Sequence, residues 1–149
     1  MAHIKAETNT TIAASPDTVY EFLADYSERR PRILTPNFSD YSVEEGGQGA
    51  GTVVRYRMGA GRERPYRMRV EEAERGSLIK ERDTDSSFTT TWELSPADGG
   101  ESTRVRVTVE WDGASGVAGI FERLFAPGGV RGVYSGVLEN LKASVEGTP

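Results

Sequence analysis

The chain has 149 residues, a formal net charge of -5, no cysteine and one histidine. A chain of this length forms one domain with its own core, and the lack of cysteine excludes disulfide frameworks, thiolate metal sites and cysteine nucleophiles. The negative charge argues against binding nucleic acid over the whole surface, so no nucleic-acid partner is expected.

The N-terminal residues, MAHIKAETNTTIAAS, lack the apolar run of a secretion signal. No stretch approaches the ~20 apolar residues that cross a bilayer. We therefore expect a cytoplasmic protein without a membrane span, organised as a single domain over residues 1–149.

The first segment, residues 4–13, alternates apolar and polar side chains, which predicts a strand. Ser15 then supplies a capping hydroxyl and Pro16 a residue suited to the first helical position. A short amphipathic helix is expected there, and a second one from residue 27 toward residue 33.

From residue 38 the apolar period changes to two and stays so for some seventy residues. Connections as short as those here join antiparallel neighbours, and one face of each strand is apolar while the other is polar. The predicted strands cover residues 38–45, 51–59, 64–73, 77–83, 86–95 and 102–112.

The C-terminal segment has apolar residues at helical spacing, at Val130, Tyr134, Val137, Leu138, Leu141 and Val145. Residues 127–129, Pro-Gly-Gly, interrupt the pattern, because proline lacks a backbone donor and each glycine lowers helix stability by about 1 kcal/mol. We expect a helix broken there. Residues 117–126 would then form a lid over the interior or turn the chain at a corner.

Six arginines lie between residues 55 and 69, several of them alternating with apolar residues. This spacing predicts cations on the solvated face of a sheet. The alternative is a docking surface for an acidic protein or nucleic acid.

Chemistry-bearing motifs are few. His3 has no partners for a metal site or a catalytic triad, so no metal and no cofactor are expected. In LIKERD, Glu81 points inward if Ile79 does and outward if Leu78 does. An inward Glu81 would act as a general acid or base, or would pair structurally with an arginine. Tyr56, Tyr66 and Tyr134 are candidates for orienting a ligand's carbonyl or hydroxyl group through hydrogen bonds.

Three motifs in order resemble the START-like (SRPBCC) superfamily, in its polyketide cyclase/dehydrase and lipid transport branch with the Bet v 1-like helix-grip fold. They are IAASPDTVYEFLADYSERRP at residues 12–31, EEGGQGAGTVVRY at 44–56 and GGESTRVRVTVEW at 99–111. The resemblance covers essentially the whole chain. It implies an α+β fold in which a curved seven-stranded antiparallel sheet grips the C-terminal helix around a cavity.

The function that the resemblance implies is binding of a small hydrophobic molecule, such as a lipid, polyketide, quinone or similar aromatic, by a monomer or weak homodimer. The alternative is a cyclase/dehydratase-type enzyme that uses Glu81, Tyr56 or Tyr66. Tyrosine and methionine on the covered face suit a cavity, although they could equally pack as core. The expected lining residues are Tyr56, Met58, Tyr66, Met68, Phe88, Thr90, Trp92, Phe121, Phe125, Val130, Tyr134 and Val137.

Overall fold

The computed structural model describes residues 3–59, 63–113 and 116–147, and of residues 116–127 it describes the backbone only. The elements are β1 (His3–Ile12), α1 (Pro16–Ala24), η1 (Arg30–Ile33), β2 (Phe38–Glu45), β3 (Val53–Met58), β4 (Arg64–Glu74), β5 (Leu78–Asp83), β6 (Thr89–Ala97), η2 (Asp98–Gly100), β7 (Ser102–Asp112) and α2 (Gly116–Val145). Each predicted strand is confirmed to within three residues at either end. The second short helix is a single 3-10 turn, η1.

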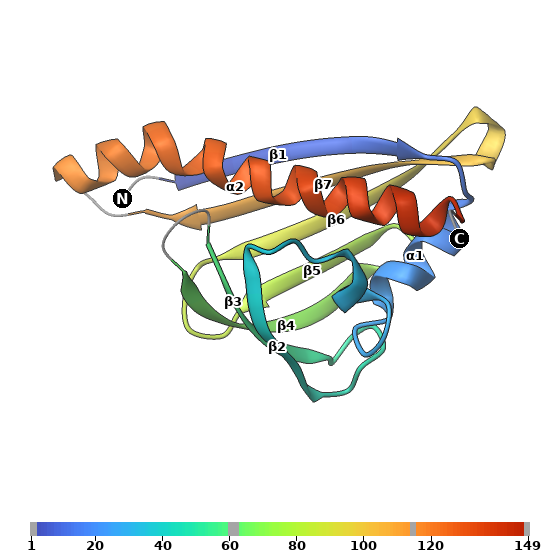
Figure 1. The fold of residues 1–149 in the computed structure, drawn as a ribbon, viewed down its shortest axis with the longest axis horizontal. Coiled ribbons are helices and arrows are strands. Elements are labelled where there is room, and N and C mark those ends of the chain that lie inside the picture. The colour runs from blue at the N-terminus through green and yellow to red at the C-terminus, as the bar shows by residue number, and fades with distance from the viewer. Residues whose placement is uncertain (1–2, 60–62, 114–115, 148–149) are drawn as a thin grey trace.

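The seven strands form one antiparallel sheet in the order β1-β7-β6-β5-β4-β3-β2. The sheet bends around α2, which crosses its concave face, while α1 lies beside the C-terminal end of α2 (Figure 1). The α+β helix-grip arrangement expected from the sequence is therefore confirmed. Alternating burial along β3, β6 and β7 places the apolar residues on this concave side.

The C-terminal helix is continuous from Gly116 to Val145, so the predicted break at residues 127–129 is wrong, and so is the separate lid or corner it implied. An internal proline removes one backbone hydrogen bond, and a helix can accommodate its ring by bending. Packing decides the outcome here, because Val133, Val137, Leu138 and Leu141 are buried against the sheet.

Polar contacts tie the last turns of α2 to β1 and η1. Lys142 Nζ donates to the carbonyl of Thr11 at 2.9 Å, and Glu146 accepts from the backbone N–H of Ala13 at 2.9 Å. On the other side, Asn140 Nδ2 donates to the carbonyl of Ile33 at 3.1 Å. These bonds fix α2 over the first strand and beside the turn that carries Arg30.

The glycine-rich loop between β2 and β3 holds the segment between α1 and η1 in place. The N–H of Tyr26 donates to the carbonyl of Gly47 at 2.8 Å, and the N–H of Gly49 donates to that of Ala24 at 2.9 Å. Gly49 has φ +60°, and a Cβ there would lie 2.5 Å from Glu72 Oε1. The loop therefore positions Tyr26 and, four residues further on, Arg30.

His3 joins the start of β1 to the end of β7. Its ring lies 3.3 Å from Asp112 and 2.9 Å from Glu110, and these hydrogen bonds raise its pKa above 6.5. Because the folded pKa is the higher one, the stabilisation is complete below pH 6.5 and is lost as the pH rises through the folded pKa.

We therefore expect His3→Gln to lower the free energy of unfolding at about pH 5.5 and to leave it nearly unchanged at about pH 8.5. Urea denaturation at both pH values measures this. An equal effect at the two pH values would show that the charge of His3 contributes nothing.

Candidate functional site

An internal cavity lies between the sheet, η1 and α2, and its volume is about 20 Å³ among the described side chains. That is room for about one water molecule, so in this conformation it is much smaller than a bound guest would need. The aromatic rings of Phe38, Tyr56, Trp92 and Tyr134 fill the space, with edge-on contacts of 5.3 Å, 6.1 Å and 6.2 Å between ring centroids. The lining residues are Tyr26, Arg30, Ile33, Leu34, Phe38, Tyr41, Val54, Tyr56, Glu81, Trp92, Tyr134 and Val137.

Glu81 points inward. Ile79 is fully buried on the concave face of β5, and Glu81, two residues on, is 3% exposed. The register that the sequence left open is therefore the one that places the carboxylate in the interior.

Three donors hold the Glu81 carboxylate. The Tyr26 hydroxyl donates to Oε2 at 2.5 Å, the Arg30 guanidinium pairs with the same oxygen through Nη2, and Trp92 Nε1 donates to Oε1 at 3.2 Å. A buried charge needs both an opposite charge and hydrogen bonds, and Glu81 has both. A general-base role for Glu81 would first require one of these contacts to break.

Arg30 is the buried cation of the site. Its guanidinium carbon lies 4.6 Å from the ring centroid of Tyr26 and 4.8 Å from that of Trp92, which is cation–π geometry on both rings. Burial lowers the pKa of Arg30, but Glu81 and the neighbouring tyrosines more than offset this, so the pKa lies above its usual value. Arg30 therefore stays charged.

The tyrosines around the cavity stay neutral. Burial, with the Glu81 charge as a further cause, raises the pKa of Tyr26 and Tyr134, and burial likewise raises that of Tyr56. Burial also raises the pKa of Tyr41 to about 12, and its hydroxyl donates to the backbone carbonyl of Tyr26 at 2.6 Å. These hydroxyls therefore serve as hydrogen-bond donors and acceptors, not as bases at neutral pH.

Among the described residues, two buried side-chain polar atoms have no hydrogen-bond partner, Arg30 Nη1 and Thr90 Oγ1. Thr90 stands opposite Glu81 in the β5–β6 ladder and is fully buried. The nearby Thr90 hydroxyl partly opposes the raised pKa of Tyr134, yet the two hydroxyls lie outside hydrogen-bonding geometry. Unpaired buried donors are rare, and each calls for an occupant such as water or a ligand.

A row of aromatic rings leads away from the cavity across the concave face. Successive ring centroids lie 6.5 Å, 5.9 Å, 4.5 Å and 5.8 Å apart. The row comprises Tyr41, Tyr56, Tyr66, Phe88 and Trp111, one ring from each of five chain segments. Tyr41, Tyr66 and Trp111 are only partly buried, so the row reaches accessible surface at both of its ends and in its middle.

The structure brings five of the residues singled out from the sequence to the cavity: Glu81, Tyr56, Trp92, Tyr134 and Val137. Met58, Met68, Phe88 and Thr90 are buried nearby, Tyr66 lies on the aromatic row and Val130 is partly buried against the core. Phe121 and Phe125 fall outside the described side chains.

Sequence reasoning missed Tyr26 and Arg30. Both lie in DYSERRPRI, where no periodicity separates Arg30 from its neighbours Arg29 and Arg32. The only signal was indirect, since an inward Glu81 requires a buried cation.

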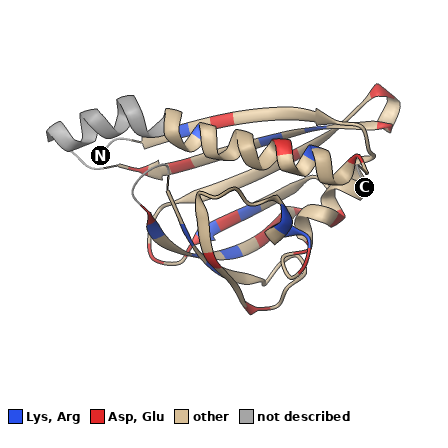
Figure 2. Cartoon of the chain, viewed as in Figure 1, with Lys and Arg blue, Asp and Glu red and all other residues tan. Residues whose placement is uncertain are grey.

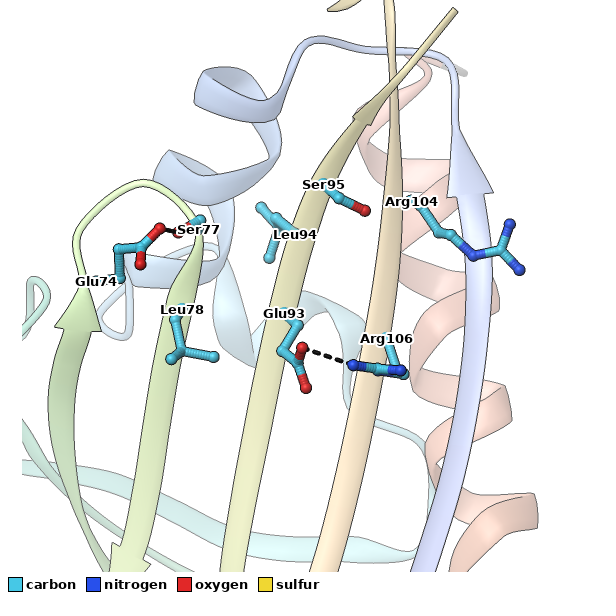
Figure 3. A pocket seen from close by; sticks show the side chains of 8 residues that line it. All are labelled: Glu74, Ser77, Leu78, Glu93, Leu94, Ser95, Arg104 and Arg106. Atoms are coloured by element: carbon cyan, nitrogen blue, oxygen red, sulfur yellow. Dashed lines mark hydrogen bonds and ion pairs between the residues drawn. The ribbon is translucent and has the colours of Figure 1, made fainter.

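Two wider depressions among the described residues lie outside the interior. One, of about 380 Å³, lies beside the turn between β4 and β5, where Glu93 and Arg106 form an ion pair of 2.7 Å (Figure 3). The other, of about 550 Å³, lies between α1 and the β2–β3 loop and is lined by charged side chains of both signs. Both are open and polar, so the smaller interior cavity with its buried charges is the better candidate site.

The arginines of β3 and β4 lie on the solvated face and have acidic neighbours. Glu44 lies 3.2 Å from Arg55 and 2.7 Å from Arg67, and Glu71 lies 2.8 Å from Arg82 on β5. Both basic and acidic residues lie on this part of the sheet and its loops (Figure 2). This mixture favours a solvated sheet face over a docking surface for a polyanion.

No helix in the described part of the chain is long and apolar enough to cross a membrane. Among the same residues, no three His, Asp or Glu side chains are grouped so that they could hold a metal ion.

Comparison with known proteins places the chain in a family. The family model described as polyketide cyclase / dehydrase and lipid transport matches residues 3–146. The solution structure of the KanY protein is 40% identical, with a TM-score of 0.86 and coverage of 99% of this chain and 100% of that chain. No curated protein matches the chain.

More distant structures share the fold. The Zhui aromatase/cyclase from Streptomyces sp. R1128 is 20% identical, with a TM-score of 0.76 over 97% of this chain and 94% of that chain. Norcoclaurine synthase from Thalictrum flavum, in complex with dopamine and hydroxybenzaldehyde, is 15% identical, with a TM-score of 0.73 over 99% and 89%. With its helix-grip fold and a family match along nearly its whole length, this chain belongs to the polyketide cyclase/dehydrase and lipid transport family.

Proposed function

We propose that the protein binds a small hydrophobic molecule, rich in aromatic or fused rings, between the concave face of the sheet and α2. The aromatic row of Tyr41, Tyr56, Tyr66, Phe88 and Trp111 is the observation that carries this proposal. Its rings present stacking surfaces to a flat guest, and three of them, Tyr41, Tyr66 and Trp111, remain partly exposed. Family membership supports the same function.

The small cavity sets a condition on binding. A volume of about 20 Å³ does not admit a ring system, so the guest must move side chains apart as it enters. Burial of its apolar surface, worth on the order of 25 cal/mol per Å², drives this opening. We therefore expect the ligand to bind by displacing side chains of the protein, and not by filling a cavity that is already open.

We expect the wild-type protein to bind N-phenyl-1-naphthylamine, an uncharged fluorescent probe, and Tyr66→Ser to bind it roughly tenfold more weakly, because the ring is lost from the middle of the row. Arg69→Ser is the matched control, since Arg69 lies on the same strand but is exposed on the other face. Fluorescence titration measures both affinities. Absence of binding to the wild type, or equal losses in the two variants, would rule out this site.

A cyclase or dehydratase remains the second candidate, because a short hydrogen bond of 2.5 Å joins Tyr26 to Glu81 in the interior. Such an enzyme must turn over a substrate, so Glu81→Gln would abolish product while N-phenyl-1-naphthylamine still binds. Product formation by Glu81→Gln at the wild-type rate would exclude the carboxylate from catalysis. We also propose that the protein is cytoplasmic, whichever of these two functions it has.

A further inference from the structure

Arg30 Nη1 is a buried hydrogen-bond donor without an acceptor. The side chain of Arg30 is 9% exposed, lines the cavity and uses Nη2 for Glu81, while Nη1 has no partner. The rings of Tyr26 and Trp92 on the guanidinium keep it from turning toward solvent. A buried donor without an acceptor is costly, so the site favours any occupant that supplies one.

Thr90 adds a second free hydroxyl on the same concave face. It is fully buried, its neighbour across the β5–β6 ladder is Glu81, and its Oγ1 has no hydrogen-bond partner. The two unpaired groups come from η1 and β6, and both residues neighbour Glu81: Arg30 pairs with its carboxylate, and Thr90 is opposite it in the ladder. Polar groups of a guest that reaches Glu81 therefore meet two unsatisfied partners.

The charge balance of the site restricts what that guest can carry. Glu81 and Arg30 form a pair whose charges cancel, and no further buried cation lies among the described lining residues. A carboxylate would bring a third charge into a buried site and leave it uncompensated. A ketone or amide oxygen accepts a hydrogen bond from Arg30 without changing the net charge.

We propose that Arg30 and Thr90 form a polar subsite that selects ligands with an uncharged carbonyl oxygen and rejects carboxylates of the same skeleton. This rests on the proposed function, because the rest of the guest must occupy the aromatic row. Arg30 Nη1 and the Thr90 hydroxyl each donate a hydrogen bond to the guest. We therefore expect fatty acids and other ionised hydrophobic acids to bind more weakly than uncharged hydrophobic ligands.

The test compares three compounds on one bicyclic skeleton: 1,2,3,4-tetrahydronaphthalene, 1-tetralone and 1,2,3,4-tetrahydronaphthalene-1-carboxylate. Dissociation constants come from NMR titration of the full chain at neutral pH. In the wild type, the carboxylate is expected to bind at least about tenfold more weakly than the tetralone. In Thr90→Val the tetralone loses about fivefold in affinity relative to the hydrocarbon.

A second variant covers Arg30. Arg30 is the cation paired with Glu81, so the double variant Arg30→Met with Glu81→Leu removes both charges together and leaves no buried carboxylate without a cation. It is expected to lose about tenfold or more in tetralone affinity relative to the hydrocarbon, since the lost donor is charged. Thr90→Val alone is expected to leave the urea midpoint unchanged or higher, because its hydroxyl has no partner to lose.

The outcomes separate the two proposals. If none of the three compounds binds, the proposed function fails and this subsite with it. If the hydrocarbon and tetralone bind but neither variant changes their affinity ratio, or if the carboxylate binds as tightly as the tetralone, the subsite alone is overturned and the unpaired atoms hold only water. A lowered urea midpoint for Thr90→Val would also overturn it, by showing that the hydroxyl is already paired.

Discussion

Replacing Arg30 alone by methionine is expected to lower the free energy of unfolding by about 3–5 kcal/mol, because the Glu81 carboxylate would remain buried without its opposite charge. Tyr26 and Trp92 would still donate to that carboxylate, but neither carries a charge. Urea denaturation of the purified variant measures the loss. The guanidinium also packs on two aromatic rings, so part of the loss comes from those contacts.

Two further variants identify the cause. The double variant Arg30→Met with Glu81→Leu is expected to recover part of the stability, because it removes the uncompensated charge but leaves the Tyr26 hydroxyl and Trp92 Nε1 without their acceptor. Arg29→Met is the matched control, since Arg29 is half-exposed and lies 3.4 Å from Asp25, so its loss should stay within about 1 kcal/mol. A double variant as unstable as the single one would mean that Arg30 acts through packing and not through charge.

The strands could be predicted because their signal is local. In a sheet covered on one side, apolar and polar residues alternate with a period of two, and Val105, Val107 and Val109 on β7 show this directly. Turn residues mark where each strand ends, and short turns allow only antiparallel pairing. The order of strands and helices along the chain is then compatible with only a few folds, and the helix-grip fold is one of them.

The site could be predicted only in part, because its contacts are not local. Glu81 pairs with a residue 51 positions earlier, and Arg30 reaches it only because the β2–β3 loop holds the segment after α1 in place. The sequence of β5 allows two registers, one with Leu78 facing the interior and one with Ile79 facing it. Six residues are too few to decide between them. The helix break was wrong for the same reason: local propensity at Pro127 does not include the packing of the turns that follow.

Leu141→Ala is expected to lower the free energy of unfolding by about 2–5 kcal/mol, because Leu141 is fully buried where α2 meets the sheet and η1 and its truncation leaves a cavity. Glu139→Ala, two residues away on the exposed side of the same helix, should change it by no more than about 0.5 kcal/mol. Urea denaturation measures both, and amide hydrogen exchange should show the loss of protection in the last turns of α2. If Leu141→Ala lost less than about 1 kcal/mol, the sheet would be stable without the grip of the helix. The opening of the interior that ligand binding requires would then involve α2 itself, and not only the aromatic side chains beneath it.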